Sequence, residues 1–252
     1  MKITLFAWLV ALFYCFPITL RAEPVQPIPI FEYHTFPPMI VSESRESGLT
    51  FGFARLLNRS SKQFNFQVEL QSLPATLSRL KNGEPAVVLF VSPIWFDDIQ
   101  REKYLWTEPV YQLRDEVVSR KEVAFEYQGP ESLLGLTVAG IEGYTYSDLE
   151  PLVQQGRAKR INFANDKEVL KALMRNKEID IAIVNSGPLS FYRNTMTLNE
   201  RLHISELPQG EYPVRILVSK ALPSVFSYIQ NTVENLPNNK MWQDMRALYL
   251  QR

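Results

Sequence analysis

Hydrophobic positions along the first half of the chain alternate between strand-like and helix-like spacing. Residues 28–33 and FQVEL at 66–70 favour strands, whereas LTFGFARLLNRSSK at 49–62 places Phe53, Leu56 and Leu57 on one helical face. SLPATLSRLKNG at 72–83 repeats leucine at helical spacing and stops at Gly83. AVVLFV at 86–91 is a continuous apolar run bounded by prolines, which is typical of a strand buried on both faces of a parallel sheet.

The second half of the chain repeats this order. LLGLTVAG at 133–140 favours a strand, and IEGYTYSDLEPLVQQG at 141–156 a loop and helix. KRINFAN predicts the next strand, and NDKEVLKALMRN a helix with Asn165 as N-cap and Glu168 completing a capping box. IDIAIV then predicts a buried strand, followed by a helix with Pro188 in its first turn. Two β-α-β-α-β units predict an α/β fold of two lobes with mainly parallel sheets.

The two units share a motif. RNKEIDIAIVNSG at 175–187 matches KNGEPAVVLFVSP at 81–93, offset by 94 positions, with Ser186 falling on Ser92. Ligands of open α/β sheets bind at the carboxyl ends of the strands. We therefore expect Ser92 and Ser186 to face each other across a cleft, one from each lobe. The alternative is that each serine caps the helix that follows its strand.

Two further apolar runs connect the units. DEVVSR at 115–120 and the run at 211–223 are the natural crossover strands, and residues 223–236 and 239–250 close the chain as helices. This arrangement predicts a signal segment at 1–22, a first lobe at 23–116 plus 216–252, and a second lobe at 117–215.

The N-terminus has the pattern of a secretory signal peptide. Lys2 precedes an apolar run from Ile3 to Leu20, and Ala22 is the predicted cleavage position. An uncleaved membrane anchor is the alternative, because the run is close to the minimum span. Cys15 is the chain's single cysteine and lacks the small neighbours of a lipoprotein site, so no lipid anchor and no disulfide are expected.

Composition and charge exclude several classes of function. The whole chain carries 27 basic and 27 acidic residues; cleavage removes two cations and leaves a net charge of −2. Nothing in that balance indicates nucleic acid as a partner. Two histidines and no mature cysteine exclude a His-rich zinc cluster, and there is no Gly-x-Ser-x-Gly elbow. No metal, cofactor or catalytic constellation is predicted. Asp97 and Asp98 are interpreted as a solvated loop, and His34 as a loop residue that serves structure or contacts ligand.

Several motifs together resemble the family 3 extracellular solute-binding proteins, the type II periplasmic proteins that serve polar amino acid ABC transporters. The similar segments are FEYHTFPPM, LKNGEPAVVLFVS, LWTEPVY, LTVAGIEGYT, RNKEIDIAIVNS and the terminal LPNNKMWQDMRALYL. The resemblance covers nearly the whole mature chain. It implies two lobes joined by two crossover strands, closing on a ligand.

The sequence departs from that family at two positions. Amino-acid binders have an arginine a few residues beyond the first serine, which clamps the ligand's carboxylate. Here that position falls near Asp97, and the nearest arginine is Arg101, which is either a displaced clamp or a surface charge. The family's second-lobe strand usually ends in an aspartate that binds an ammonium, whereas this strand ends in Asn185.

Aromatic and glycine-containing loops complete the predicted site. Trp95 and Phe36 are expected to form apolar walls, with core packing as the alternative for Trp95. The loop at 140–145 precedes a helix, and its backbone N–H groups could hold an anionic group. The predicted ligand-binding residues are Phe36, Ser92, Trp95, Arg101, Gly143, Tyr144, Thr145, Asn185 and Ser186.

These observations predict a monomeric periplasmic solute-binding protein that is not an enzyme. It would capture a small polar or amino-acid-like molecule for an ABC permease. Two alternatives stay open: a ligand-sensing partner of a membrane receptor, and a module that acts only through protein contacts. Transport and sensing both use ligand-driven closure about a hinge.

Overall fold

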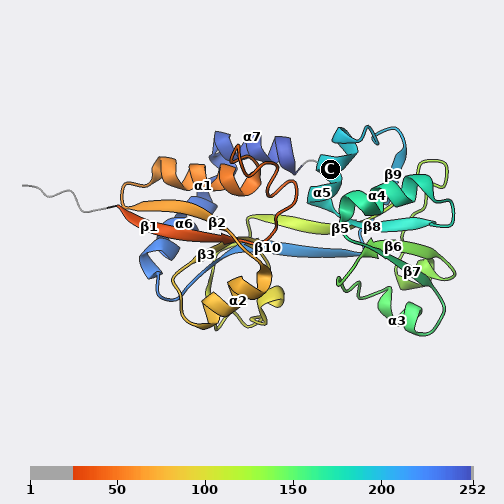
Figure 1. Cartoon of the computed structure of the whole chain (residues 1–252), viewed down its shortest axis with the longest axis horizontal. Helices are drawn as coiled ribbons and strands as arrows, with labels where there is room; N and C mark the ends of the chain where they lie inside the picture. Colours follow the sequence, from red (N-terminus) through yellow and green to blue (C-terminus); the bar gives the residue numbers. More distant parts are fainter. Residues whose placement is uncertain (1–24, 251–252) are drawn as a thin grey trace, which may run out of the picture.

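A computed structural model describes residues 25–250. The chain folds into two lobes connected by two long strands, β5 (Tyr111–Arg120) and β10 (Gly210–Val218) (Figure 1). The predicted signal segment, including Cys15, lies outside the described residues. Within residues 25–250, no helix is long and apolar enough to cross a membrane.

The N-terminal lobe contains both ends of the described chain. Its strands are β1 (Gln26–Glu32), β2 (Phe64–Leu70), β3 (Val87–Val91) and β4 (Leu105–Trp106). Its helices are α1 (Leu49–Ser60), α2 (Leu73–Lys81), η1 (Pro93–Phe96), α6 (Pro223–Asn235), η3 (Leu236–Asn238) and α7 (Lys240–Tyr249). In Figure 1, α1 and α7 cover one face of the sheet and α2 the other.

The C-terminal lobe is formed by one continuous segment. Its strands are β6 (Thr137–Ile141), β7 (Lys159–Phe163), β8 (Ile181–Asn185) and β9 (Leu202–Ile204). Its helices are η2 (Pro130–Leu133), α3 (Glu150–Gln154), α4 (Asp166–Arg175) and α5 (Ser186–Thr195). The helices α4 and α5 lie on one side of the strands and α3 on the other (Figure 1).

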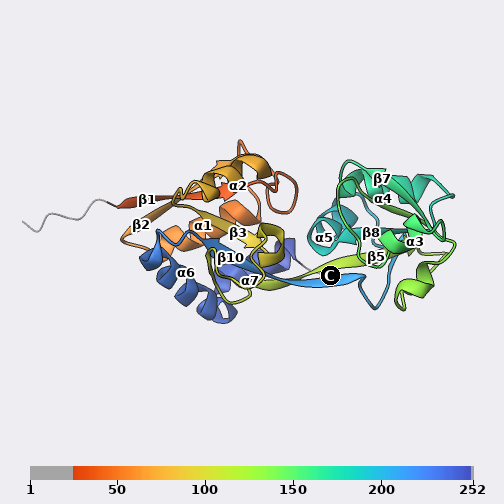
Figure 2. The same cartoon turned by 90° about the horizontal axis from the view of Figure 1, so that it is seen from below.

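The strands form one hydrogen-bonded path in the order β2-β1-β3-β10-β5-β8-β6-β7. Pairs β1–β2, β1–β3, β6–β7 and β6–β8 are parallel, as the continuous apolar runs predicted. The first half of β10 pairs with β5, and its second half pairs with β3 and β4. Figure 2 shows both strands running from one lobe to the other. The two predicted crossovers are therefore present.

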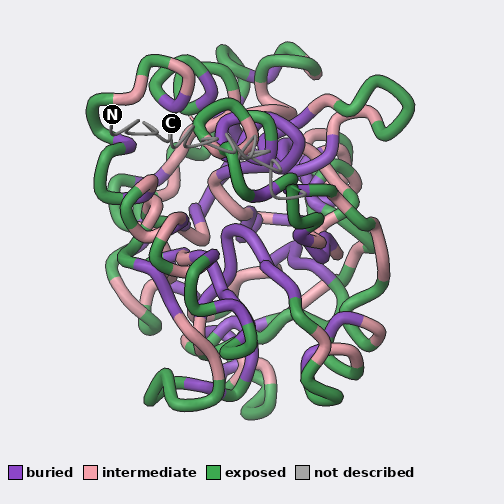
Figure 3. The backbone as a smooth tube through the Cα atoms, turned by 90° about the vertical axis from the view of Figure 1, so that its left-hand side faces the viewer, coloured by how far each residue is buried: buried purple, intermediate pink, exposed green. Residues whose placement is uncertain are grey.

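The two lobes are packed with different side chains. In the N-terminal lobe, the rings of Phe53, Phe90 and Trp242 form a mutually contacting group, with Phe53 5.2 Å from Phe90 between centroids. In the C-terminal lobe, α4 and α5 cover the sheet mainly with aliphatic residues such as Leu170, Leu173 and Leu189. Buried backbone lies in the interior of each lobe, whereas most of the peripheral loops are exposed (Figure 3).

The helix signals of the second unit are confirmed in part. Asn165 caps α4 by accepting the Glu168 N–H at 3.1 Å. The Glu168 carboxylate does not complete a capping box, because it pairs instead with Lys171. The serine-cap alternative is wrong for Ser186, and Ser92 occupies the N-cap position of η1 without a capping bond. Ser92 makes no side-chain cap bond, and Asn185, not Ser186, caps α5 through the Gly187 N–H.

Candidate ligand-binding site

The carboxyl ends of the strands in the two lobes meet. Tyr33 follows β1 and Tyr144 follows the end of β6, and their phenols are close enough for the charge of Tyr144 to affect Tyr33. Burial is the main cause of the raised pKa of Tyr33, and Glu32 and Tyr144 raise it further. A Cβ placed on Gly187, in the first turn of α5, would lie 3.3 Å from Cδ of Pro38. The loop after β1 therefore packs against the C-terminal lobe.

Four rings form the N-terminal side of this meeting point. The rings of Tyr33 and His34 are 4.0 Å apart, and His34 lies 5.6 Å from Phe36 and 6.3 Å from Trp95 in edge-on geometry. Trp95 is 37% exposed, so the alternative of core packing does not describe it. We call Tyr33, His34, Phe36 and Trp95 the aromatic wall. It combines two predicted residues, Phe36 and Trp95, with two that the site prediction lacked.

A buried carboxylate is hydrogen-bonded to the backbone at the start of this wall. Glu32, the last residue of β1, is 2% exposed and accepts hydrogen bonds from the His34 N–H and the Thr50 hydroxyl. Thr50 belongs to α1, so the pair ties the start of the loop to a helix of the N-terminal core. Without these bonds the buried carboxylate would be costly, so Glu32 fixes how the loop leaves the sheet.

The loop after β3 is organised by Asp98, which corrects its interpretation as solvated. Asp97 is exposed, but Asp98 is 3% exposed and accepts from the Trp106 indole at 2.7 Å and from three backbone N–H groups. Burial opposes ionisation of Asp98, yet these donors outweigh it and lower its pKa. The adjacency of two aspartates gave no sign that their environments would differ.

Arg101 belongs to the same loop, which holds it through its backbone. Its backbone is left-handed, with φ of 60°, and its N–H donates to the Asp98 carbonyl. Its guanidinium is close enough to Arg215 for its charge to add to the effect of burial in lowering the pKa of Arg215. Among the described residues, no hydrogen bond or ring contact joins Arg101 to the wall. Ser92 lies nearer the wall in sequence but is 5% exposed, and its carbonyl accepts from the Trp95 N–H.

The C-terminal side begins with the loop at 141–145. Arg160 of β7 donates to the carbonyls of Ile141 at 2.7 Å and Tyr144 at 2.8 Å, which fixes the turn. Gly143 adopts φ of 79°, a conformation that favours glycine. The Tyr144 N–H donates within the turn to Ile141, so this amide is not available to the anionic group that the sequence analysis placed here. Thr145 completes the loop, and its role stays a prediction.

Two aspartates lie beside this loop. Asp166, the first residue of α4, is 4% exposed, and its carboxylate accepts a long hydrogen bond, 3.4 Å, from the Asn185 N–H. Burial raises the pKa of Asp166 to about 7 and that of Asp115, on β5, to about 6. Asp115 pairs in the sheet with Asn185. Tyr144 lies near both, and burial with these charges raises its pKa to about 12.

The structure thus brings Tyr144 and Asn185 together around aspartates that the site prediction lacked. Asp166 was interpreted only as part of a helix start. Its place directly after a parallel strand was a usable signal, because strand ends line ligand sites. Asp115 had no such signal, since its approach depends on how β5 pairs with β8. Ser186 points to the connecting strand, where its hydroxyl accepts from the Arg114 N–H.

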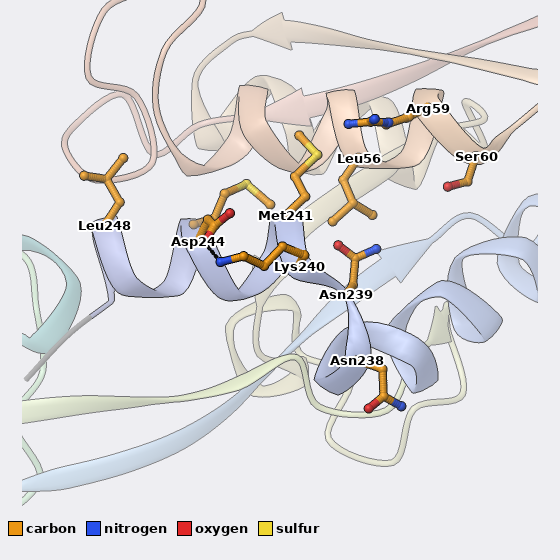
Figure 4. Close-up of a pocket in the computed structure, with 10 residues that line it drawn as sticks. Leu56, Arg59, Ser60, Asn238, Asn239, Lys240, Met241, Asp244 and Leu248 are labelled. Atoms are coloured by element: carbon orange, nitrogen blue, oxygen red, sulfur yellow. Dashed lines mark hydrogen bonds and ion pairs between the residues drawn. The ribbon is translucent and has the colours of Figure 1, made fainter.

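Hollows also lie outside this region. One of about 300 Å³ is lined by Tyr111, Ser186, Gly187 and Arg246, at the base of the junction between the lobes. A groove of about 840 Å³ lies on the outside of the N-terminal lobe, between α1 and α7 (Figure 4). No group of three or more potential metal-ligating side chains occurs within residues 25–250.

Comparison with known proteins places the fold. No protein-family model matches the sequence, and no curated protein matches it. Solved structures match over most of their length. An ancestral amino acid-binding protein, described as a precursor of cyclohexadienyl dehydratase, is 13% identical with a TM-score of 0.65 and covers 89% of this chain and 96% of its own.

Two further structures give the same picture. A putative binding component of an ABC transporter from Wolinella succinogenes, complexed with lysine, is 11% identical with a TM-score of 0.68, covering 90% of this chain and 96% of its own. The GluR0 ligand-binding core from Nostoc punctiforme, in complex with L-glutamate, is 16% identical with a TM-score of 0.64, covering 90% and 100%. The chain therefore has the two-lobed fold of type II periplasmic binding proteins.

Proposed function

We propose that this protein is a periplasmic solute-binding protein that captures a small polar or amino-acid-like ligand between its lobes, for an ABC transporter. The observation that carries the proposal is the approach of the strand ends of the two lobes, where Tyr33 of the aromatic wall lies near Tyr144, and Tyr144 lies near Asp166 and Asp115. Ligands of open α/β sheets bind at such ends. Within residues 25–250, the sheets of the lobes are connected through β5 and β10, which suits closure about a hinge.

The proposal extends to what the protein does not do. We infer a monomeric binding protein without catalysis, exported by a cleaved signal segment at 1–22. Support comes from the structural neighbours, most of which are described as binding proteins. One neighbour is described as the precursor of an enzyme, so assays for turnover of any bound compound belong in the first characterisation.

A thermal-shift screen of residues 23–252 tests the proposal directly. Amino acids, small peptides, organic acids, sugars and amines are added to protein freed of ligand by unfolding and refolding. A compound at 100 times its dissociation constant stabilises the folded state by about 2.7 kcal/mol, a measurable rise in melting temperature. No response to any compound class would argue against a solute-binding protein.

Substitutions then locate the site. Trp95→Ala is expected to raise the dissociation constant of the best compound by about tenfold, because an exposed ring beside the junction loses its ligand contact. Arg101→Ala separates the displaced clamp from the surface charge: a carboxylate ligand bound by Arg101 would lose a similar amount. Leu248→Ala, at an exposed position on α7, is the control. If Trp95→Ala and Arg101→Ala both bind like the unmodified protein, the ligand site lies elsewhere.

A further inference from the structure

The C-terminal side of the junction has an excess of buried acceptors. Asp166 is nine-tenths buried, and no lysine, arginine or histidine among the described residues forms an ion pair with it or with Asp115. A buried carboxylate without a cation is unfavourable. In a protein that binds solutes, a cation supplied by the ligand would remove that penalty.

A third acceptor lies beside the same strand and has no partner. Gln209 is 7% exposed, and its Oε1 is buried without a hydrogen bond. Its backbone N–H donates to the Asp115 carbonyl, and its Nε2 donates to the Ser147 hydroxyl. This anchors its amide between β5, which holds Asp115, and the segment that holds Tyr146. The Tyr212 hydroxyl is hydrogen-bonded to Asp115. The group that lacks a hydrogen bond here is therefore an acceptor, the Gln209 Oε1, and it requires a donor.

The opposite side supplies a matching surface. The aromatic wall presents ring faces and edges, and cations bind favourably over such faces. Arg101, the candidate clamp for a ligand carboxylate, has no hydrogen bond or ring contact with this wall among the described residues, and its charge lies near Arg215. The arrangement thus favours a positive group and supplies no paired carboxylate clamp.

We propose that the interlobe site recognises an organic cation, a primary or substituted amine, with Asp166 as its counter-charge and Asp115 and the aromatic wall enclosing it. This rests on the proposed function and names its ligand class. Asp166 takes over the electrostatic role that the neutral Asn185 lacks, from a neighbouring strand end. An amine without an α-carboxylate satisfies the site, so the ligand need not be an α-amino acid.

The surroundings of Asp166 predict how binding varies with pH. The groups that face its carboxylate are Asp115 on β5, Tyr144 and Tyr146 after β6, Tyr192 on α5, and the Asn185 N–H. Behind them, Arg160 of β7 lies over the Tyr146 ring and pairs with Glu150, and no cation among the described residues forms an ion pair with Asp166. A bound amine must therefore keep Asp166 ionised. Amine affinity should be nearly constant between about pH 8 and pH 9, where the amine is still protonated, and should fall about 30-fold by pH 5.5, because Asp166 takes up a proton near pH 7.

The test uses pairs of probes that differ in charge. Putrescine is compared with 1,4-butanediol, and choline with 3,3-dimethyl-1-butanol, by calorimetry on residues 23–252; succinate represents anions. An amine is expected to bind at least about tenfold more tightly than its neutral match. Asp166→Asn should weaken the amine at least about tenfold and remove the pH dependence. Asp244→Asn, on α7, should do neither, because Asp244 is exposed and pairs only with Lys240.

The possible failures are distinct. If a neutral or anionic compound binds and Asp166→Asn leaves its affinity unchanged, the cation proposal is overturned and the solute-binding function stands. If no compound binds the folded protein, both are overturned. Asp115→Asn provides a second variant: weaker amine binding supports the pair as the recognition element. If Asp166→Asn and Asp115→Asn both leave the amine affinity unchanged, the amine binds at another site and the proposal is overturned.

Discussion

The two repeated units of this chain have the same element order but end differently. In the N-terminal lobe, α2 and β3 are followed by η1, a short turn that Asp97 ends in a left-handed conformation. In the C-terminal lobe, α4 and β8 are followed by α5, ten residues long and capped by Asn185. The short turn leaves Trp95 exposed at the strand end, whereas the full helix covers the sheet.

The two sheets therefore present different side chains at the carboxyl ends of their strands, which we call the N-terminal edge and the C-terminal edge. The N-terminal edge presents rings, and its buried charge, Glu32, is satisfied by Thr50 and the His34 N–H. The C-terminal edge presents Asp166 and Asp115, which have no cationic partner among the described residues. A duplicated topology therefore does not imply a duplicated site. The fold supplies two facing edges, and a few residues after each strand decide what each edge can bind.

The largest expected effect contrasts the two cores. Phe53→Ala removes a ring in contact with Phe90 and Trp242 and should lower the free energy of unfolding by about 4 kcal/mol. Leu170→Ala in the aliphatic core should cost about 3 kcal/mol. Urea unfolding monitored by circular dichroism measures both. A cost below about 1 kcal/mol for either variant would show that its lobe repacks readily.

An intermediate effect on stability is expected from Asp166, the buried carboxyl group of the C-terminal edge. The pKa of Asp166 is raised from 3.8 to about 7, so between these values the folded state binds a proton that the unfolded state lacks. Stability from this group is complete below about pH 4 and is lost as pH rises through 7. Asp166→Asn carries no charge and should therefore stabilise the protein by about 2 kcal/mol at pH 8.

The same variant should have little effect near pH 4, where Asp166 is protonated in the folded state and close to half protonated in the unfolded state. Thermal unfolding at pH 4, 6 and 8 measures the trend, with Asp244→Asn as a matched exposed control. An equal effect at all three values would contradict a titrating Asp166. Higher stability together with weaker amine binding is the usual relation between a functional charge and the fold that holds it.

The smallest effect adds a third carboxylate to the same edge. Asn185→Asp keeps an N-cap residue of equal quality but places a charge beside Asp115 and Asp166. It should lower stability by about 1 kcal/mol at pH 8, and the loss should disappear at pH 5, where its neighbours are protonated. Asn239→Asp is the control, because Asn239 caps α7 far from the aspartates. A similar loss in both variants would indicate a capping effect instead of repulsion.

Much of the fold could be predicted from hydrophobic spacing. The continuous runs at 86–91 and 179–184 are the buried strands β3 and β8, and the capping signal at Asn165 starts α4. These features are local, since a strand or helix needs only its own period and end residues to be recognised. The exact lobe boundaries and the roles of the predicted site residues stay predictions.

The site was less accessible from the sequence. Phe36 and Trp95 were predicted because large aromatics follow strand ends, and tertiary packing places Tyr33 and His34 beside them. Asp98 was misread because its burial depends on Trp106, eight positions away. Asp115 was missed because its neighbour, Asn185, lies 70 positions further along the chain.

The sequence by itself determined the order of elements, the repeated unit and the two crossover strands, because each depends on the period and the end signals of a short segment. Only the tertiary structure decided which side chains share an environment. The pairing of β5 with β8 brought Asp115 to Asp166, and the packing of the loop after β1 on α5 brought Tyr33 to Tyr144. Burial and charge are properties of such neighbourhoods, so the chemistry of this protein emerges with its long-range contacts.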